Sequence, residues 1–458
     1  MNKFFGDKKF YKRIMALILP IMIQNGITNF VNMLDNIMVG RVGTAEMTGV
    51  AVANQLLFVF NLCIFGAVSG AGIFGAQFYG KNDQNGVRYT FRFKMIFSSV
   101  LAVGAMLLFN FYGENLIMLY LKGEGTPEEI AATLSFAKKY MAVMIWGLLP
   151  FSWAQSYSST LRECGKTVLP MIGGVSAVVV NLIGNTVLIF GLLGAPRLSV
   201  VGAAIATVAS RYVEVAIIAV WTRIKSKDNP FIVGAYRSFK VPTELIKQIA
   251  IKGLPLMANE VLWAMGIATV NQCYSRCGIQ VVSANNIVQT FWNVFAVAFM
   301  AIGVAIGIVV GQQLGAGDTK EAKLSASRLI TFSVIVGLAV GIAFAVAAIW
   351  IPNFYNTEES VKRTATAMMQ IAGLAMPLDA CAHATYFTLR SGGKTFITFV
   401  FDSGYVWLIN IPVALSLVNF SGLTIIPIYL ICQLLLIFKA ALGIIFVAKG
   451  SWAKQIVS

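Results

Sequence analysis

Charged residues are scarce in this chain. They make up 12% of its 458 residues, about half the share in a soluble domain, while hydrophobic residues make up 58%. There is one histidine, and the six cysteines show no zinc-site spacing. No phosphate-binding loop or nucleophile motif occurs. These scarcities exclude an ordinary soluble domain and argue against metal or haem chemistry, so we expect no enzyme activity and no bound cofactor.

Long apolar runs are abundant instead, and short charged loops separate them. A transmembrane helix needs roughly 20 apolar residues. The runs are continuously apolar without period-two alternation, which favours helices over a β-barrel. The first run is too long for the apolar core of a cleavable leader, so we take it as the first span. The twelve predicted spans are residues 14–38, 48–78, 92–112, 134–158, 167–191, 199–222, 246–272, 282–311, 327–351, 364–388, 396–418 and 424–448.

The formal net charge of +16 is unevenly distributed. If the N-terminus is cytoplasmic, most lysines and arginines fall in loops on the inner side, and the polar 223–245 connection is rich in them. The positive-inside rule therefore predicts a multi-pass protein of the inner (cytoplasmic) membrane with both termini cytoplasmic. We expect membrane lipids around it, no nucleic-acid partner, and a monomer.

The chain contains an internal repeat. Residues 19–83 recur as residues 254–318 at a constant offset of 235, with thirteen identical positions that include Pro20/Pro255 and Gln77/Gln312. Because each half holds six spans, both halves start on the same side and the repeat is parallel. The predicted fold is an all-α polytopic membrane protein with twelve transmembrane helices in two six-helix lobes, related by a parallel pseudo-two-fold repeat. The N-lobe is residues 1–222, the cytoplasmic connection 223–245, and the C-lobe 246–458.

A second match supports the repeat. Residues 161–167 resemble residues 389–395 at an offset of 228, and each stretch lies between the fourth and fifth span of its half. The change in offset indicates a net deletion between the two matched blocks.

Acidic residues within spans are energetically costly and usually functional. Five meet this description: Asp35, Glu214, Glu260, Asp379 and Asp402. Glu260 and Asp379 lie at similar depths from the inner boundary, so they could share a sodium ion or exchange a proton. Asp402 either lines the cavity or pairs with polar neighbours. Glu214 follows Arg211 by three residues, which predicts an internal ion pair.

A polar stripe accompanies Asp35 on the first span. Asn25, Asn32 and Asn36 recur at helical spacings with it and share one face, which must line a wet cavity or meet polar partners. We interpret Asp35 as a candidate site for Na⁺ or a proton. The alternative is an acid at the outer end of a helix near Arg41.

Three further side chains accompany the acids of the C-lobe. Asn259 and Trp263 flank Glu260, and His383 lies four residues after Asp379 on the same helix face. These residues are candidates for the cavity lining. The alternative for His383 is a hydrogen-bonded packing histidine.

The chain resembles the MATE (multidrug and toxic compound extrusion) family over nearly its whole length. The similar stretches are Leu19-Pro20 with residues 34–40, the glycine–glutamine motifs 75–80 and 311–315, and residues 198–207. The resemblance implies that Asp35 is the cation site of the N-lobe. Asn181 matches the family's fifth-span asparagine, while Asn185-Thr186 stands where the family usually carries Asp-Pro.

The resemblance also implies a function. Several branches of the family place a C-lobe acid where Asp379 stands, and the expected activity is Na⁺- or H⁺-coupled antiport of small organic cations by alternating access. Any metal would be Na⁺, at Asp35 or at Glu260 and Asp379. The first alternative is a lipid-linked oligosaccharide flippase of related fold, whose cavity would be basic, whereas the charges within these spans are mostly acidic. The second is a receptor or scaffold without transport.

Overall fold

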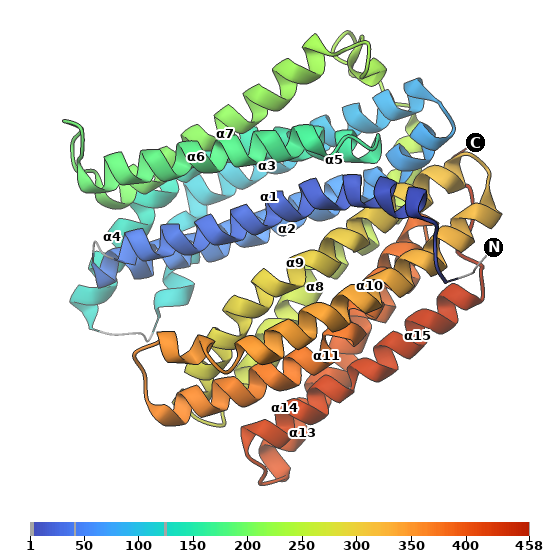
Figure 1. The fold of residues 1–458 in the computed structure, drawn as a ribbon. Helices are drawn as coiled ribbons and strands as arrows, with labels where there is room; N and C mark the ends of the chain where they lie inside the picture. The colour runs from blue at the N-terminus through green and yellow to red at the C-terminus, as the bar shows by residue number, and fades with distance from the viewer. Residues whose placement is uncertain (1–3, 41–42, 123–125, 458) are drawn as a thin grey trace. The chain divides into compact units, whose positions relative to one another are not determined.

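The computed structural model is helical along the chain (Figure 1). It describes residues 4–40, 43–122 and 126–457, and at residues 32–37 and 40 the backbone alone. Within these ranges there is no β-strand. The predicted all-α fold class is therefore confirmed.

The described residues form twelve helical segments, six on each side of a polar connection. The first six are α1 (Lys8–Gly40), α2 (Thr44–Gly80), α3 (Gln84–Leu121), α4 with η1 and α5 (Pro127–Met144, Ile145–Gly147, Leu148–Glu163), α6 (Val168–Phe190) and α7 (Ser199–Ile224). The next four are α8 (Thr243–Ser275), α9 (Ile279–Gly315), α10 (Thr319–Ala347) and α11 (Glu359–Ser391). The eleventh segment consists of α12 (Thr395–Phe399), the π-helical turns η4 (Val400–Gly404) and η5 (Val406–Asn410), and α13 (Ile411–Phe420). The twelfth consists of α14 (Ile425–Leu434) and α15 (Leu436–Ala448).

Ten of these segments are long and apolar enough to cross a membrane. The other two, residues 127–163 and α11, are the fourth segment of each half, and both are among the predicted spans. Each is surrounded by its own half: α5 contacts α3, α6 and α7, while α11 contacts α9, α10, α14 and α15. Buried polar residues such as Ser156 and Thr385 therefore face protein instead of lipid, which relaxes the demand for apolar composition.

The chain divides into two compact units. Unit 1 comprises Met1–Met22, Ala76–Asp83 and Ala250–Ser458, and unit 2 comprises Ile23–Gly75 and Gln84–Ile249. Two short pieces of the N-terminal half thus belong to the unit that holds α8 to α15. The lobe boundaries expected from the repeat stay a prediction.

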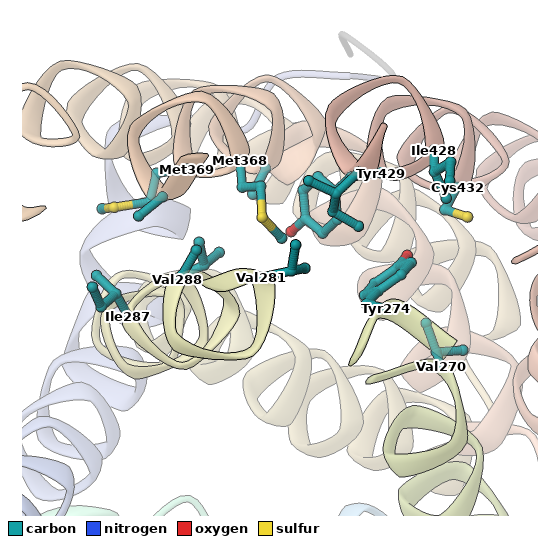
Figure 2. Packing of buried hydrophobic residues seen from close by; sticks show 14 of the residues in the cluster. Val270, Tyr274, Val281, Ile287, Val288, Met368, Met369, Ile428, Tyr429 and Cys432 are labelled. Carbon is teal, nitrogen blue, oxygen red and sulfur yellow. The ribbon is translucent and has the colours of Figure 1, made fainter. Parts of the chain in front are cut away.

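The apolar core of unit 1 is formed by side chains from α8, α9, α11 and α14 (Figure 2). Tyr274 of α8 and Tyr429 of α14 meet edge to face, with ring centroids 5.7 Å apart. Val288 of α9 and Met368 of α11 are fully buried in the same core. Because lipid tails are as apolar as these side chains, close packing stabilises such a core more than transfer out of water does.

The second sequence match is also a structural match. Gly165 ends the turn after α5 and Gly393 the turn after α11, with φ of 75° and 73°. The next amide in each turn, of Lys166 or Lys394, donates to a carbonyl five residues earlier, at 2.8 and 3.3 Å. Only glycine adopts this left-handed backbone without cost, which explains why both copies carry it.

The ends of α2 and α9 meet within unit 1 in a reciprocal backbone contact. A β-carbon on Gly80 would lie 1.9 Å from the carbonyl oxygen of Gln312, and one on Gly315 would lie 1.9 Å from that of Gln77. The two contacts are related by the offset of 235. The repeated glycine–glutamine motifs are therefore the places where two copies of one segment touch.

Gln77 also holds the C-terminal tail. Its Nε2 donates to the carbonyls of Ser391 and Lys454 at 3.0 and 3.3 Å, and its Oε1 accepts from the amide of Ile456 at 2.8 Å. Trp452 of the same tail is 1% exposed. The tail is thus an integral part of unit 1.

The connection between the halves is folded against unit 2. Arg92 of α3 donates to the carbonyls of Gly234 and Ala235, at 2.8 Å each, and Arg88 donates to the carbonyl of Phe231 at 3.3 Å. Phe231 is 1% exposed. These contacts make the connection a bound structural element of unit 2.

We expect Gly80→Ala to destabilise the protein, because the added β-carbon would overlap the carbonyl of Gln312. Overpacking of this kind typically costs about 1–3 kcal/mol. The midpoint of thermal unfolding in detergent, followed by tryptophan fluorescence, measures the effect. Gly104→Ala in α3 is the control, since nothing lies within 4 Å of its β-carbon position and alanine favours a helix. Equal midpoints for the two variants would contradict the backbone contact.

Candidate functional site

Acidic, cationic and polar side chains gather inside unit 1. Glu260 lies on α8, Asp379 on α11 and Asp402 on η4, and each is half-buried, so part of each side chain remains accessible. We call the whole group the unit 1 polar cluster. Its members are Asn259, Glu260, Asp379, His383, Tyr386, Arg390, Asp402 and Lys439.

Each acid of the cluster lies within a π-helical turn or within five residues of a proline inside its helix. Pro255 precedes Glu260 by five residues, and Pro377 precedes Asp379 by two. Asp402 lies within a π-helical turn. Proline and π-helical turns both disrupt the regular backbone hydrogen bonds, and π-turns are frequent at functional sites. The backbone at all three acids is therefore easier to deform than an uninterrupted helix.

Asn259 joins α8 to the π-helical segment. Its Nδ2 donates to Asp402 Oδ2 at 3.0 Å, and its Oδ1 accepts from the hydroxyl of Ser403 at 2.7 Å. The same Nδ2 lies 3.4 Å from the hydroxyl of Tyr386. Asn259, a predicted lining residue, thus fixes the position of Asp402.

Asp402 forms an ion pair with Lys439 of α15. Lys439 Nζ lies 2.6 Å from Asp402 Oδ1, and the two side chains are 12% and 16% exposed. The ammonium also lies 5.4 Å from the centre of the Tyr405 ring. Of the two interpretations left open for Asp402, the structure shows pairing with polar neighbours, inside the polar cluster.

Glu260 and Asp379 have different charged side chains as neighbours. Arg390 attracts the ionised Glu260 and Asp402 repels it, while Lys439 is the charged neighbour of Asp379. The two predicted acids therefore belong to one cluster but are connected through the Asp402–Lys439 pair. Counted as ionised, three carboxylates face two cations, which leaves one negative charge uncompensated.

His383 and Trp263 are placed mainly by aromatic and apolar contacts. The His383 ring lies 4.9 Å from that of Phe387 and 6.4 Å from that of Phe299, and it fills the space beside Gly303. Asp402, Lys439 and Arg390 are its charged neighbours. Trp263 packs against the apolar core of unit 1.

The cationic residues of the cluster were not among the site residues predicted from the sequence. Lys439 lies in the middle of the last predicted span, so a search for cations within spans would have found it. Arg390 belongs to the repeated 389–395 stretch, which the sequence places between two spans, whereas the structure places it in the last turn of α11. Tyr386 carries no sequence signal, because aromatic residues are common throughout the spans.

The predicted polar residues of the N-terminal half lie in unit 2. Asn185 Nδ2 donates to Asn181 Oδ1 at 3.3 Å, and Asn181 Nδ2 donates to the hydroxyl of Thr207 on α7 at 3.1 Å. Asn25 is half-buried on α1. Asn32, Asp35 and Asn36 lie outside the residues whose side chains are described.

Arg211 and Glu214 do not form the predicted ion pair with each other in the described part of the chain, so this prediction is wrong. Arg211 donates to the carbonyl of Gly147 at 3.3 Å and lies over the ring of Phe151. Glu214 has both Arg211 and Arg162 as charged neighbours. A spacing of three residues placed the two groups on one helix face, but Arg211 extends to a neighbouring helix instead.

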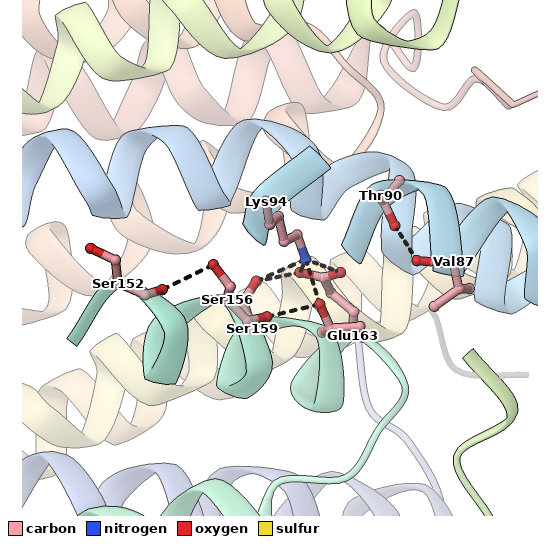
Figure 3. Close-up of polar contacts among 8 residues, drawn as sticks. Val87, Thr90, Lys94, Ser152, Ser156, Ser159 and Glu163 are labelled. Atoms are coloured by element: carbon pink, nitrogen blue, oxygen red, sulfur yellow. Dashed lines mark hydrogen bonds and ion pairs between the residues drawn. The ribbon is translucent and has the colours of Figure 1, made fainter. Parts of the chain in front are cut away.

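Unit 2 contains a buried ion pair that the sequence reasoning missed. Lys94 Nζ of α3 lies 2.6 Å from both carboxylate oxygens of Glu163 at the end of α5 (Figure 3). The side chains are 0% and 8% exposed. A β-carbon on Gly72 or Gly75 of α2 would lie 2.7 or 2.1 Å from the Glu163 carboxylate. The glycines of α2 thus make room for this pair.

No group of three or more His, Cys, Asp or Glu side chains in the described ranges is arranged to hold a metal ion. The carboxylates of the unit 1 polar cluster can exchange one positively charged partner for another. One carboxylate can be balanced by a proton, a small cation or an organic cation.

The chain is similar to known proteins in both sequence and fold. The family model MatE matches residues 20–187 and 255–415. The "Probable multidrug resistance protein NorM" of Thermotoga maritima is 26% identical over 455 residues, which cover 97% of this chain and 94% of that protein.

Solved structures share the fold. A multidrug resistance MATE family transporter in an outward-facing conformation gives a TM-score of 0.86 at 18% identity, over 99% of this chain and 98% of that one. A MOP superfamily transporter from Pyrococcus furiosus gives 0.87 at 18% identity, over 97% and 96%.

We expect Lys94→Met to lower the thermal midpoint strongly, because it leaves the Glu163 carboxylate buried without its cation. Breaking such a pair typically costs about 3–5 kcal/mol. The double variant Lys94→Met, Glu163→Gln should recover part of the loss. Lys138→Met is the control, since its pair with Glu114 is about half exposed and surface pairs contribute little. If the single buried variant melts like this control, the pair is not needed for stability.

Proposed function

This chain belongs to the MatE family of multidrug efflux transporters, and we propose that it couples the export of small organic cations to the entry of Na⁺ or H⁺. Members of this family are transporters, and the protein is a multi-pass membrane protein. The coupling ion and the substrate class are our proposal.

The observation that carries the proposal is the charge balance of the unit 1 polar cluster. Among the residues that the structure describes, the cationic neighbours of Glu260, Asp379 and Asp402 are Arg390 and Lys439. An uncompensated carboxylate inside a membrane is costly, so the cluster favours one further positive charge. A coupling ion and a cationic substrate can supply that charge in turn, but not together.

We assign the exchangeable charge to Glu260 and Asp379. Asp402 is bound directly by Lys439 and Asn259, which makes it the least available of the three acids. Binding of the coupling ion at Glu260 or Asp379 would remove the negative charge that retains the substrate. Alternating access then follows if ion-bound and substrate-bound forms favour opposite facing states.

The groups near the acids suit amphipathic cations. Tyr386, Phe387 and His383 form an aromatic row on α11, and Trp263 lies one turn from Glu260 on α8. Aromatic faces attract cations and provide adaptable apolar contact. Asn25, Asn32 and Asn36 remain candidate lining residues on the evidence of the sequence.

Asp35 is the second candidate coupling site. Its role rests on the polar stripe of α1 and on the family resemblance, and Asn181 with Asn185 would supply amide oxygens nearby. We further propose that the protein works as a monomer in the inner membrane with both termini cytoplasmic, as its basic loops indicate.

The oligosaccharide flippase is the less favoured function. A pyrophosphate-bearing substrate needs a surplus of positive charge at its binding site. The unit 1 polar cluster has a surplus of negative charge instead. That difference favours cationic cargo.

The test is transport by the purified protein in liposomes. With an imposed Na⁺ or pH gradient and a fluorescent organic cation, we expect one of the two gradients to drive substrate movement. Asp379→Asn and Glu260→Gln should each lower the initial rate at least tenfold, because they remove the exchangeable charge. Glu244→Gln is the matched control, an exposed acid in the first turn of α8.

Two outcomes would reject parts of the proposal separately. If neither gradient drives movement of the dye by the wild-type protein, cation coupling is wrong. If a gradient drives transport and both cluster variants match Glu244→Gln, coupling stands but its assignment to this cluster is wrong, and Asp35→Asn becomes the variant to measure.

A further inference from the structure

The end of α7 and the folded connection line a half-open basic cavity within unit 2. The cavity has a volume of about 400 Å³, enough for a glycerophosphate group. Its lining contains two arginines, one from the last turn of α7 and one from the connection, and no acidic residue. The lining residues are Arg223, Ser226, Ile232, Val233, Gly234, Tyr236 and Arg237.

The two arginines differ from the neighbouring Arg88 and Arg92 on α3, whose guanidinium groups donate to backbone carbonyls of the connection. Arg223 and Arg237 are exposed and form no ion pair within the described ranges. Asp228 and Glu244 are the acids of residues 223–245, and neither lines the cavity. Two guanidinium groups therefore face one cavity with their charge uncompensated.

The cavity is rigidly built. Arg88 and Arg92 hold residues 231–235, and the hydroxyl of Tyr236 is hydrogen-bonded to that of Tyr157 on α5. Lys166 binds the side chain of Asn229 at 2.8 Å. A preformed site loses little entropy when it binds a ligand.

The surroundings of the cavity are apolar and exposed. Arg223 ends α7, one of the segments apolar enough to cross a membrane. Trp221 and Ile224 beside it are 49% and 73% exposed, and Phe239 of the connection is 73% exposed. Aromatic and basic residues together at the end of a span are typical of the membrane–water interface. A ligand here would meet positive charge and apolar surface at once.

We propose that this cavity binds the phosphate headgroup of an anionic membrane lipid, such as phosphatidylglycerol. Arg223 and Arg237 bind the phosphate through charge-assisted hydrogen bonds, for which the planar guanidinium is well suited. The acyl chains lie along the exposed apolar residues at the end of α7. Basic pockets beside transmembrane helices bind anionic headgroups in this way. The lipid then joins α7 to the connection and stabilises both.

The test measures lipid binding to the full-length protein in detergent by native mass spectrometry. Titration with phosphatidylglycerol should show one saturable lipid. Arg223→Gln, Arg237→Gln should weaken its affinity at least about tenfold, since two charge-assisted contacts are lost. The matched control is Lys225→Gln, Lys227→Gln, which removes the same charge from the same segment but not from the cavity lining. It should bind like the wild type.

Several outcomes would overturn the proposal. Equal weakening in the control would show diffuse attraction to a basic surface. Phosphatidylcholine has a headgroup without net charge. Equal affinity for it would show that the site does not select lipids by the net charge of the headgroup. Saturable binding of inorganic phosphate or glycerol phosphate that displaces the lipid equally well would assign the site to a soluble anion. The single variants Arg223→Gln and Arg237→Gln should each weaken binding by an intermediate amount, so the result does not depend on one variant folding.

Discussion

An ionised group inside a membrane needs a partner of opposite charge or a set of hydrogen bonds, and this requirement organises both units. Glu163 is satisfied by Lys94, Asp402 by Lys439, and Arg162 of α5 donates to Gln24 of α1 at 2.6 Å. Each partner comes from a different helix, so every such pair also fixes the packing of two segments. Charge compensation is complete at the Lys94–Glu163 pair and incomplete at the unit 1 polar cluster. The same rule that stabilises the fold therefore also underlies our proposal that an outside cation binds at this cluster.

The fold was largely predictable because it depends on composition and repetition. Apolar runs locate spans even where polar residues interrupt them, and the offsets of 235 and 228 identify segments of the two halves that match. The acids of the site were predictable too, because a carboxylate is conspicuous in an apolar run. Their partners were not. Lys439 is 37 residues from Asp402, and Lys94 is 69 residues from Glu163. Only tertiary packing decides such pairs, and the failed Arg211–Glu214 pair shows that spacing on one helix is a poor substitute.

Irregular helix geometry coincides with the functional positions. Pro255, Pro377 and the two π-helical turns interrupt α8, α11 and the α12–α13 segment beside the acids. A similar coincidence occurs on α1, where the boundary between the compact units falls two residues after Pro20. A helix with a missing hydrogen bond can bend there at low energetic cost. Such deformable backbone near the acids fits the proposed change of facing state, in which some helices must move.

The reciprocal contact between Gly80 and Gly315 has a consequence for how this chain can evolve. After a gene duplicates and fuses, its two copies are usually free to diverge, and here the acids have done so: Glu260 aligns with Asn25. At the glycine–glutamine motifs the two copies contact each other directly, because each glycine faces the backbone of the other motif. A substitution in one copy must be tolerated by the other copy within the same molecule. The contact therefore couples the two motifs, so that neither can change its backbone approach without affecting the other.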